Sequence, residues 1–150
     1  MSEAKTGVFP CYENQFQVGA NKEGLKDIAD MVTFSVSIDN GVEEWNPYDQ
    51  KGWVRRLMTA KSITISIAGK RNVGDPGNDY VNGLALKNGR DVEGCLQWTF
   101  PNGDTLLFEN AIFSITNWNA GDSTTVAPLE FDVMSNGKPT YTEATSTSGN

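Results

Sequence analysis

The chain has 150 residues, of which 38% are hydrophobic and 21% charged, and these values are typical of one globular domain rather than a disordered chain. Its 12 Lys+Arg against 19 Asp+Glu give a formal net charge of −7, which disfavours a surface made to bind DNA or RNA. The chain has no histidine, so the commonest general base and the usual zinc ligand are missing.

Alternation of apolar and polar residues predicts strands in the first half of the chain. Gln15–Val18 is a short candidate. Met31–Ile38 is predicted to turn Val32, Phe34, Val36 and Ile38 inward, whereas its opposite face carries hydroxyls: Thr33, Ser35 and Ser37. Ser62–Ile67 repeats the pattern, with Ile63, Ile65 and Ile67 inward and Ser62, Thr64 and Ser66 outward. Both strands are therefore expected to have a solvated hydroxyl face.

Residues 40–60 show no clear period and are predicted to form a long irregular loop with Trp45, Tyr48 and Trp53. Compact domains rarely keep such a loop without a function. Exposed aromatic side chains on a loop are typical of sugar stacking or of protein contact. The alternative is that these side chains fold over the sheet and cover the core.

Basic residues are concentrated between Gln50 and Asn72, a stretch without any acid. It holds six of the 12 bases: Lys51, Arg55, Arg56, Lys61, Lys70 and Arg71. One interpretation is a solvated patch that balances acidic neighbours, and nucleic-acid binding is disfavoured by the acidic flanks. The third is a protein–protein surface that meets an acidic surface of another copy, which favours head-to-tail association.

One helix is predicted over Asn78–Leu86, capped by Asn78 or Asp79, with Gly89 just beyond its end. The oxygen-rich stretch Asp75–Asp79 resembles a calcium loop faintly. A turn followed by a helix cap explains the same residues, so ion binding is left open here.

The second half of the chain is also predicted to be β-structure. Glu93–Phe100 and Thr105–Asn117 are expected to form a hairpin around Pro101–Asp104, with a bulge near Glu109–Asn110. Thr124–Met134 is the next strand, with Leu129, Phe131 and Val133 inward, and Lys138–Glu143 is expected to pair back after a turn at Asn136-Gly137. The final residues, 144–150, are predicted to be a mobile tail.

No catalytic constellation emerges from the sequence. There is no P-loop pattern, no GxSxG and no suggestive carboxylate pair, so no enzymatic activity, cofactor or metal site is predicted. Cys11 and Cys95 are expected to be reduced and mostly buried. No apolar run reaches the length of a transmembrane helix, and the first residues lack the apolar core of a signal peptide, so folding in a cytoplasm is expected.

Four stretches, in this order, resemble the major tail tube proteins of long-tailed, siphovirus-type bacteriophages: GWVRRLMTAKSITISIAGKRN, GDPGNDYVNGLAL, GCLQWTFPNGDTLLFENAIFSIT and NGKPTYT. The resemblance covers about Met31 to Thr142 and lies in the order of the motifs. It implies a mainly β fold, a β-sandwich or small barrel with one short α-helix, as a single tail-tube domain over residues 1–150 with residues 1–30 as N-terminal arm and first strand.

The resemblance also implies a function. Tail tube proteins form hexameric rings that stack into a hollow tube through which DNA passes, with tape measure, terminator and tip proteins as partners. Long loops and terminal arms reach between rings in that family. The implied location is the virion tail, assembled in the host bacterial cytoplasm, without membrane association. Related tubes of contractile tails and phage-derived bacteriocins are not separated from it by sequence.

Two sets of candidate site residues follow. The predicted subunit or ring interface consists of Trp45, Tyr48, Trp53, Arg55, Arg56, Lys61 and Arg71. The predicted lumen wall consists of Thr33, Ser35, Ser37, Ser62, Thr64 and Ser66, because an acidic, hydroxyl-rich surface lets DNA slide. Two rivals remain: a carbohydrate-binding β-sandwich module, and a small β-barrel enzyme with paired carboxylates.

Overall fold

The computed structural model describes residues 6–144, and the predicted tail beyond Ala144 lies outside them. Within this range the chain has one α-helix, α1 (Pro76–Asn82), and eight strands: β1 (Gln15–Gly19), β2 (Lys26–Asp27), β3 (Met31–Trp45), β4 (Arg55–Lys70), β5 (Glu93–Thr99), β6 (Thr105–Trp118), β7 (Pro128–Met134) and β8 (Thr140–Thr142). Short 3-10 turns add η1 (Cys11–Glu13), η2 (Lys22–Gly24), η3 (Tyr48–Gln50) and η4 (Gly89–Val92). The predicted mainly β fold with one short helix is confirmed.

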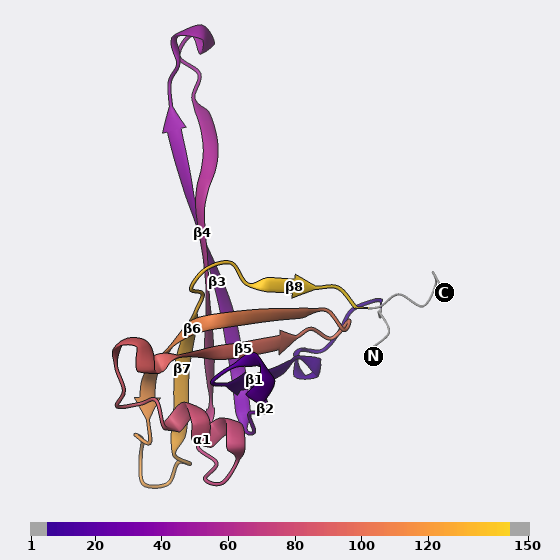
Figure 1. Ribbon diagram of the computed structural model, residues 1–150, viewed down its shortest axis with the longest axis vertical. Helices are drawn as coiled ribbons and strands as arrows, with labels where there is room; N and C mark the ends of the chain where they lie inside the picture. Colours follow the sequence, from indigo (N-terminus) through magenta and orange to yellow (C-terminus); the bar gives the residue numbers. More distant parts are fainter. Residues whose placement is uncertain (1–5, 145–150) are drawn as a thin grey trace.

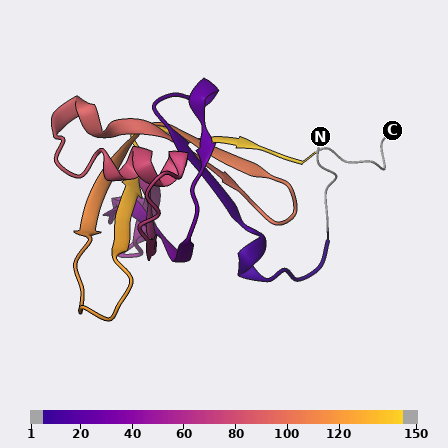
Figure 2. The same cartoon turned by 90° about the horizontal axis from the view of Figure 1, so that it is seen from below.

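All eight strands belong to one antiparallel sheet in the order β2-β1-β5-β6-β7-β4-β3, with β8 paired to the start of β6. The sheet curls, because Phe16 of β1 and Phe34 of β3 stand far apart in this order yet their ring centroids are 4.9 Å apart. The strands therefore form an incompletely closed barrel rather than two packed sheets, and α1 lies across one end (Figures 1 and 2).

The core fills the inside of this curled sheet and confirms most predicted inward faces. It includes Ile65, Leu96, Phe108, Phe113, Leu129, Phe131 and Val133, each at most 1% exposed. Val81 and Leu84 bring α1 and the turn after it into the same cluster. Burial of this apolar area supplies the main free energy that stabilises the folded chain.

A long arm made by β3 and β4 projects from the body (Figure 1). The two strands stay paired from Phe34 with Ile67 out to Trp45 with Arg55, with one register shift between Gly41 and Val42. The prediction of a long irregular loop over residues 40–60 is therefore wrong, and only residues 46–54 turn the chain. The apolar alternation fades there because the arm covers no core of its own.

The predicted inward face of Met31–Ile38, in β3, is only partly buried. Phe34 packs against the core, but Val32 is 69% exposed, Ile38 is 53% exposed and Val36 is also exposed. Val32 lies beside the register shift at the start of β3, whereas Val36 and Ile38 lie further along the strand, toward the arm. No part of the described chain fully covers these three side chains. Such an unpartnered apolar face is a common mark of a contact surface.

Helix α1 begins earlier than predicted. Its N-cap is Asp75, whose Oδ2 accepts the backbone N–H of Asn78 at 3.0 Å, and Pro76 occupies the first helical position. The sequence Asp-Pro is a good start signal because proline needs no N–H partner there. Gly89 does not end this helix, which finishes at Asn82.

The predicted hairpin of β5 and β6 is confirmed, and so is its bulge. The turn is closed by the backbone bond from Phe100 N–H to the Asp104 carbonyl at 2.8 Å. The register of β5 against β6 shifts between Gly94 and Leu96, opposite Asn110, which has a positive φ of 59°. Asparagine tolerates this conformation better than most residues.

The last described strand, β8, is held by Asp104. The Asp104 carboxylate accepts hydrogen bonds from the Tyr141 hydroxyl and from the Ala144 backbone N–H, the latter at 2.7 Å. The Tyr141 bond is the largest cause that lowers the pKa of Asp104, and the same bond raises the pKa of Tyr141 above 10.0. The β8 contact is thus stabilised by an ionised Asp104 and a protonated Tyr141.

This pair gives a pH prediction. The Asp104 contribution to stability is present above the ordinary Asp pKa of about 3.9 and lost as pH falls through the lowered folded pKa. A carboxyl carbon NMR titration of the monomeric protein should therefore show an Asp104 midpoint below the ordinary value. In Tyr141→Phe the midpoint should rise, because the main stabilising donor is gone. Equal midpoints in the two proteins would contradict this contact.

Candidate assembly surfaces

The hydroxyl residues predicted as a lumen wall lie on one face of the sheet. Cross-strand partners in an antiparallel pair share a face. Ser35 pairs with Ser66, and Ser37 pairs with Thr64. Thr33 opposes Ala68 and Ser62 opposes Asp39, so all six predicted positions are brought together. That they line a lumen stays a prediction.

Acidic residues extend this polar face onto the neighbouring strand. Asp132 of β7 pairs with Ser66, and Glu130 pairs with Ala68. With Asp39 of β3, three carboxylates lie on the face, against one base, Lys70 at the end of β4. The hydroxyl positions are exposed apart from Thr64, which is half-buried. The face therefore repels a polyanion and offers it few binding groups.

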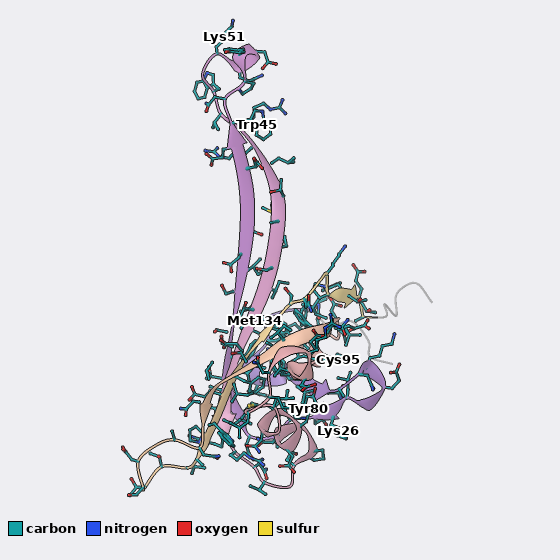
Figure 3. The ribbon with its side chains drawn as sticks, turned by 60° about the vertical axis from the view of Figure 1, so that its left-hand side comes forward. Lys26, Trp45, Lys51, Tyr80, Cys95 and Met134 are labelled. Carbon is teal, nitrogen blue, oxygen red and sulfur yellow. The ribbon has the colours of Figure 1, made fainter. Side chains whose placement is uncertain are left out.

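The predicted interface aromatics lie at the far end of the arm, where Trp45 and Lys51 are labelled in Figure 3. Tyr48 is fully exposed, Trp53 is 77% exposed and Trp45 is 40% exposed. The alternative that they cover the core is wrong, because the whole arm separates them from it. Apolar surface of this extent on a solvent-exposed hairpin is costly unless another molecule covers it.

The bases of the arm have local partners. Arg55 lies over the Trp45 ring at 5.9 Å, and Arg56 Nε forms an ion pair with Glu44 at 2.9 Å. Lys61 donates a hydrogen bond to the Asn40 side chain. Both members of the Arg56 ion pair are more than half exposed, so this pair adds little stability and stays accessible to a further partner.

Arg71 belongs elsewhere. It lies at the base of the sheet beside α1, with only 11% of its side chain exposed, and its guanidinium bonds Asp79 at 2.8 Å and the Asn78 side chain at 2.7 Å. The Arg71 hydrogen bond is the main cause that lowers the pKa of Asp79. The basic stretch seen in the sequence is thus divided in space, and Arg71 anchors the helix rather than the arm.

A groove of about 740 Å³ lies between the chain around β1 and the first half of β3. Its lining combines aromatic and apolar side chains with two carboxylates. It includes Tyr12, Phe16, Asp27, Asp30, Phe34 and Val36. The groove is not predictable from the sequence, because β1 and β3 lie near opposite ends of the strand order and approach each other only through the curl of the sheet.

The remaining candidate sites have structural explanations. The Asp75 carboxylate caps α1 and also accepts the Ala29 backbone N–H, which supports the turn-and-cap interpretation of Asp75–Asp79. Among residues 6–144 no cluster of His, Cys, Asp and Glu could hold a metal ion. Cys95 is buried as predicted, but Cys11 is exposed, and neither forms a disulfide.

Within the described part of the chain, no helix is both long and apolar enough to cross a bilayer.

No protein-family model and no curated protein sequence matches the chain. Solved structures do match. A chain from the tail of an empty GTA particle, refined with helical C6 symmetry, superposes with a TM-score of 0.72 and 18% identity, covering 91% of this chain and 100% of that chain. A chain from the PVC sheath/tube terminator, part of an extracellular contractile injection system, superposes with a TM-score of 0.63 and 17% identity. The match covers 93% of this chain and 100% of that chain.

A third match is a chain from the PVC sheath-tube complex in the extended state, with a TM-score of 0.60, 18% identity and coverage of 92% of this chain and 93% of that chain. At these identities the matches establish a shared fold. The protein therefore has the fold of subunits found in phage-like tails and in contractile injection systems, over nearly the whole length of both chains.

Proposed function

We propose that the protein is a structural subunit of a phage-type tail tube and has no enzymatic role. The observation that carries the proposal is the fold, which spans 91% of this chain and all of a chain from a C6-symmetric tail. That tail supports six copies per ring, with rings stacked into a hollow tube. Terminator, tape measure and tip proteins would be its other partners, in a virion tail assembled in the bacterial cytoplasm.

The arm and the edge of the sheet support self-assembly. Among the described residues β3 pairs only with β4, so the outer edge of a 15-residue strand is bare. Such edges attract another strand, and closing a ring of subunits removes them. The arm, with its exposed aromatic tip, is suited to contact a copy in the next ring.

The polar face of the sheet supports passage of DNA along the tube. It combines the predicted lumen residues with Asp39, Glu130 and Asp132. A wall that bound phosphates would slow a passing genome, whereas a negative, hydroxyl-rich wall does not hold it. We assign this face to the lumen.

Electron microscopy tests the proposal directly. Concentrated wild-type protein, with or without sheared tail fragments as nuclei, is expected to form hollow tubes with six-fold end views. Dispersed monomers under both conditions would contradict the proposal. The arm does not support the carbohydrate-binding alternative, because its aromatic side chains lie on a narrow hairpin tip rather than on a wide platform. A glycan screen of the wild-type protein is therefore expected to be negative.

The lumen assignment makes a labelling prediction. In a Cys11→Ser background, Ser35→Cys and Ser66→Cys are exposed in the free subunit and should react there with any maleimide. In assembled tubes, a maleimide on a polymer too large for the lumen should label them at least about tenfold more slowly, because the wall faces an enclosed channel. A small maleimide controls for general loss of reactivity. Equal rates with the large reagent would place this face outside.

A further inference from the structure

We infer that the groove between β1 and β3 is the receptor for the arm tip of another copy of this chain. This inference rests on the proposed function and adds to it the surface that joins one ring to the next. The tip is defined as Trp45–Leu57, and the groove by the six lining residues named above.

The tip combines apolar surface with positive charge. Tyr48, Trp53 and Leu57 are 100%, 77% and 60% exposed, so most of their apolar area faces solvent in the free subunit. Between Trp45 and Leu57 the chain has three bases and one acid, a net charge of +2. Large aromatic side chains beside arginine are the residue types that dominate binding energy at protein interfaces.

The groove has the complementary composition. Its lining holds Asp27 and Asp30 and no basic residue, a net charge of −2. Phe16 and Phe34 form part of its apolar wall, and Val36 remains exposed within it. A volume of about 740 Å³ accommodates aromatic side chains, and it falls within the usual range of ligand pockets.

The positions of tip and groove require two molecules. Both involve β3: its first residues, around Phe34, line the groove, and its last residue, Trp45, begins the tip. Phe34 and Trp45 are eleven steps apart along the strand, or about 36 Å at 3.3 Å per step. The arm points away from the body, so the tip cannot reach the groove of its own chain (Figure 1). A contact between different surfaces propagates head to tail, as stacking of rings requires.

Native Cys11 offers a direct test, because it is exposed and lines the groove. Gln50→Cys places a thiol at the tip without removing an aromatic or a base. In assembled tubes, copper phenanthroline or a short bis-maleimide should join this introduced thiol of one copy to Cys11 of the next and give a ladder of covalent multimers. The ladder should disappear in Cys11→Ser. Ser123→Cys, in the exposed β6–β7 loop, is the matched control and should give no ladder through Cys11.

Charge exchange gives a second test. Arg55→Glu in the tip or Asp27→Lys in the groove should each raise the critical concentration for tube assembly about fivefold, and combining the two should restore it toward the wild-type value. Asp122→Lys makes the same charge change away from the groove and should leave assembly unchanged.

The outcomes separate the two proposals. Tubes that form without any Cys11-dependent ladder, together with no rescue in the charge exchange, overturn the groove assignment while the tail-tube function stands. If the wild-type chain forms no tubes at all, the proposed function fails and the groove assignment fails with it.

Discussion

Asn78→Ala is expected to destabilise the isolated subunit by about 3 kcal/mol, one of the largest losses available from a polar side chain in this protein. Asn78 is fully buried, and its amide joins three segments. Its Nδ2 donates to the carbonyl of Lys70 at 2.9 Å and to that of Ala29 at 3.3 Å. Its Oδ1 accepts from the Arg71 guanidinium and from the Asn72 backbone N–H.

Alanine would leave these buried partners without the amide and create a small void beside a guanidinium that is mostly excluded from water. The loss should appear in urea denaturation of the unassembled subunit and as a fall in Tm of roughly 6–12 °C. Asn46→Ala is the matched control, since the Asn46 side chain makes one bond, to Gly52, at an exposed site in the arm. If Asn78→Ala has the same melting temperature as the wild type, the hydrogen bonds of Asn78 do not stabilise the fold.

The sequence predicted the body of the subunit well, because its strands bury one face in a core. Alternation at Ile63, Ile65 and Ile67, and again at Leu129, Phe131 and Val133, appears in the structure as the buried face of β4 and β7. The bulge in β6 was also predictable, since Glu109–Asn110 breaks the alternation where Asn110 takes a positive φ. Patterns of this kind report burial, so they are informative wherever a strand has a core to cover.

The arm could not be predicted in this way. Its outer residues bury nothing within the chain, so selection for a core leaves no period there, and Pro47 and Gly52 suggested a loop instead. The start of α1 does carry a sequence signal, because Asp75-Pro76 is a helix start of the usual kind, whereas the predicted caps, Asn78 and Asp79, lie inside the helix. Asn78 proved to be the buried anchor, a role that depends on partners distant in sequence.

The candidate surfaces also differ in whether strand period predicts them. The hydroxyl face could be predicted because it follows from strand period alone, and the pairing of Ser35 with Ser66 unites its two halves. The groove could not be predicted, because Phe16 of β1 and Phe34 of β3 meet only through the curl of the sheet. Arg71 was grouped with the arm by its position in sequence, although it lies beside α1.

Removing the arm is expected to abolish tube formation while leaving the subunit folded. Asp39 and Ser62 are cross-strand partners, so an Asn-Gly turn can replace residues 40–61 and close the shortened hairpin. The deleted residues are exposed except for Pro47 and Val54, which are half-buried, and none belongs to the core. The melting temperature of the variant should therefore stay within a few degrees of the wild type.

The energetics of the arm explain why assembly should be lost completely. A two-stranded hairpin without a core is marginally stable in water, yet this one extends far from the body and exposes Val42, Leu57 and Met58 along its length. Exposed apolar side chains on such a hairpin are typical of a surface that contacts with another molecule cover. Electron microscopy and sedimentation of concentrated variant should show monomers or single rings and no tubes.

A smaller deletion distinguishes the contribution of the turn, residues 46–54, from that of the paired strands of the arm. Trp45 and Arg55 are also partners, so replacing residues 46–54 with Asn-Gly removes Tyr48 and Trp53 but keeps the paired arm. If the turn of the tip, with Tyr48 and Trp53, supplies the contact between rings, this variant should fail as completely as the full deletion. If it forms tubes while the full deletion does not, the contact lies along the paired strands of the arm. Tubes from both variants would mean that stacking depends on the body of the subunit alone.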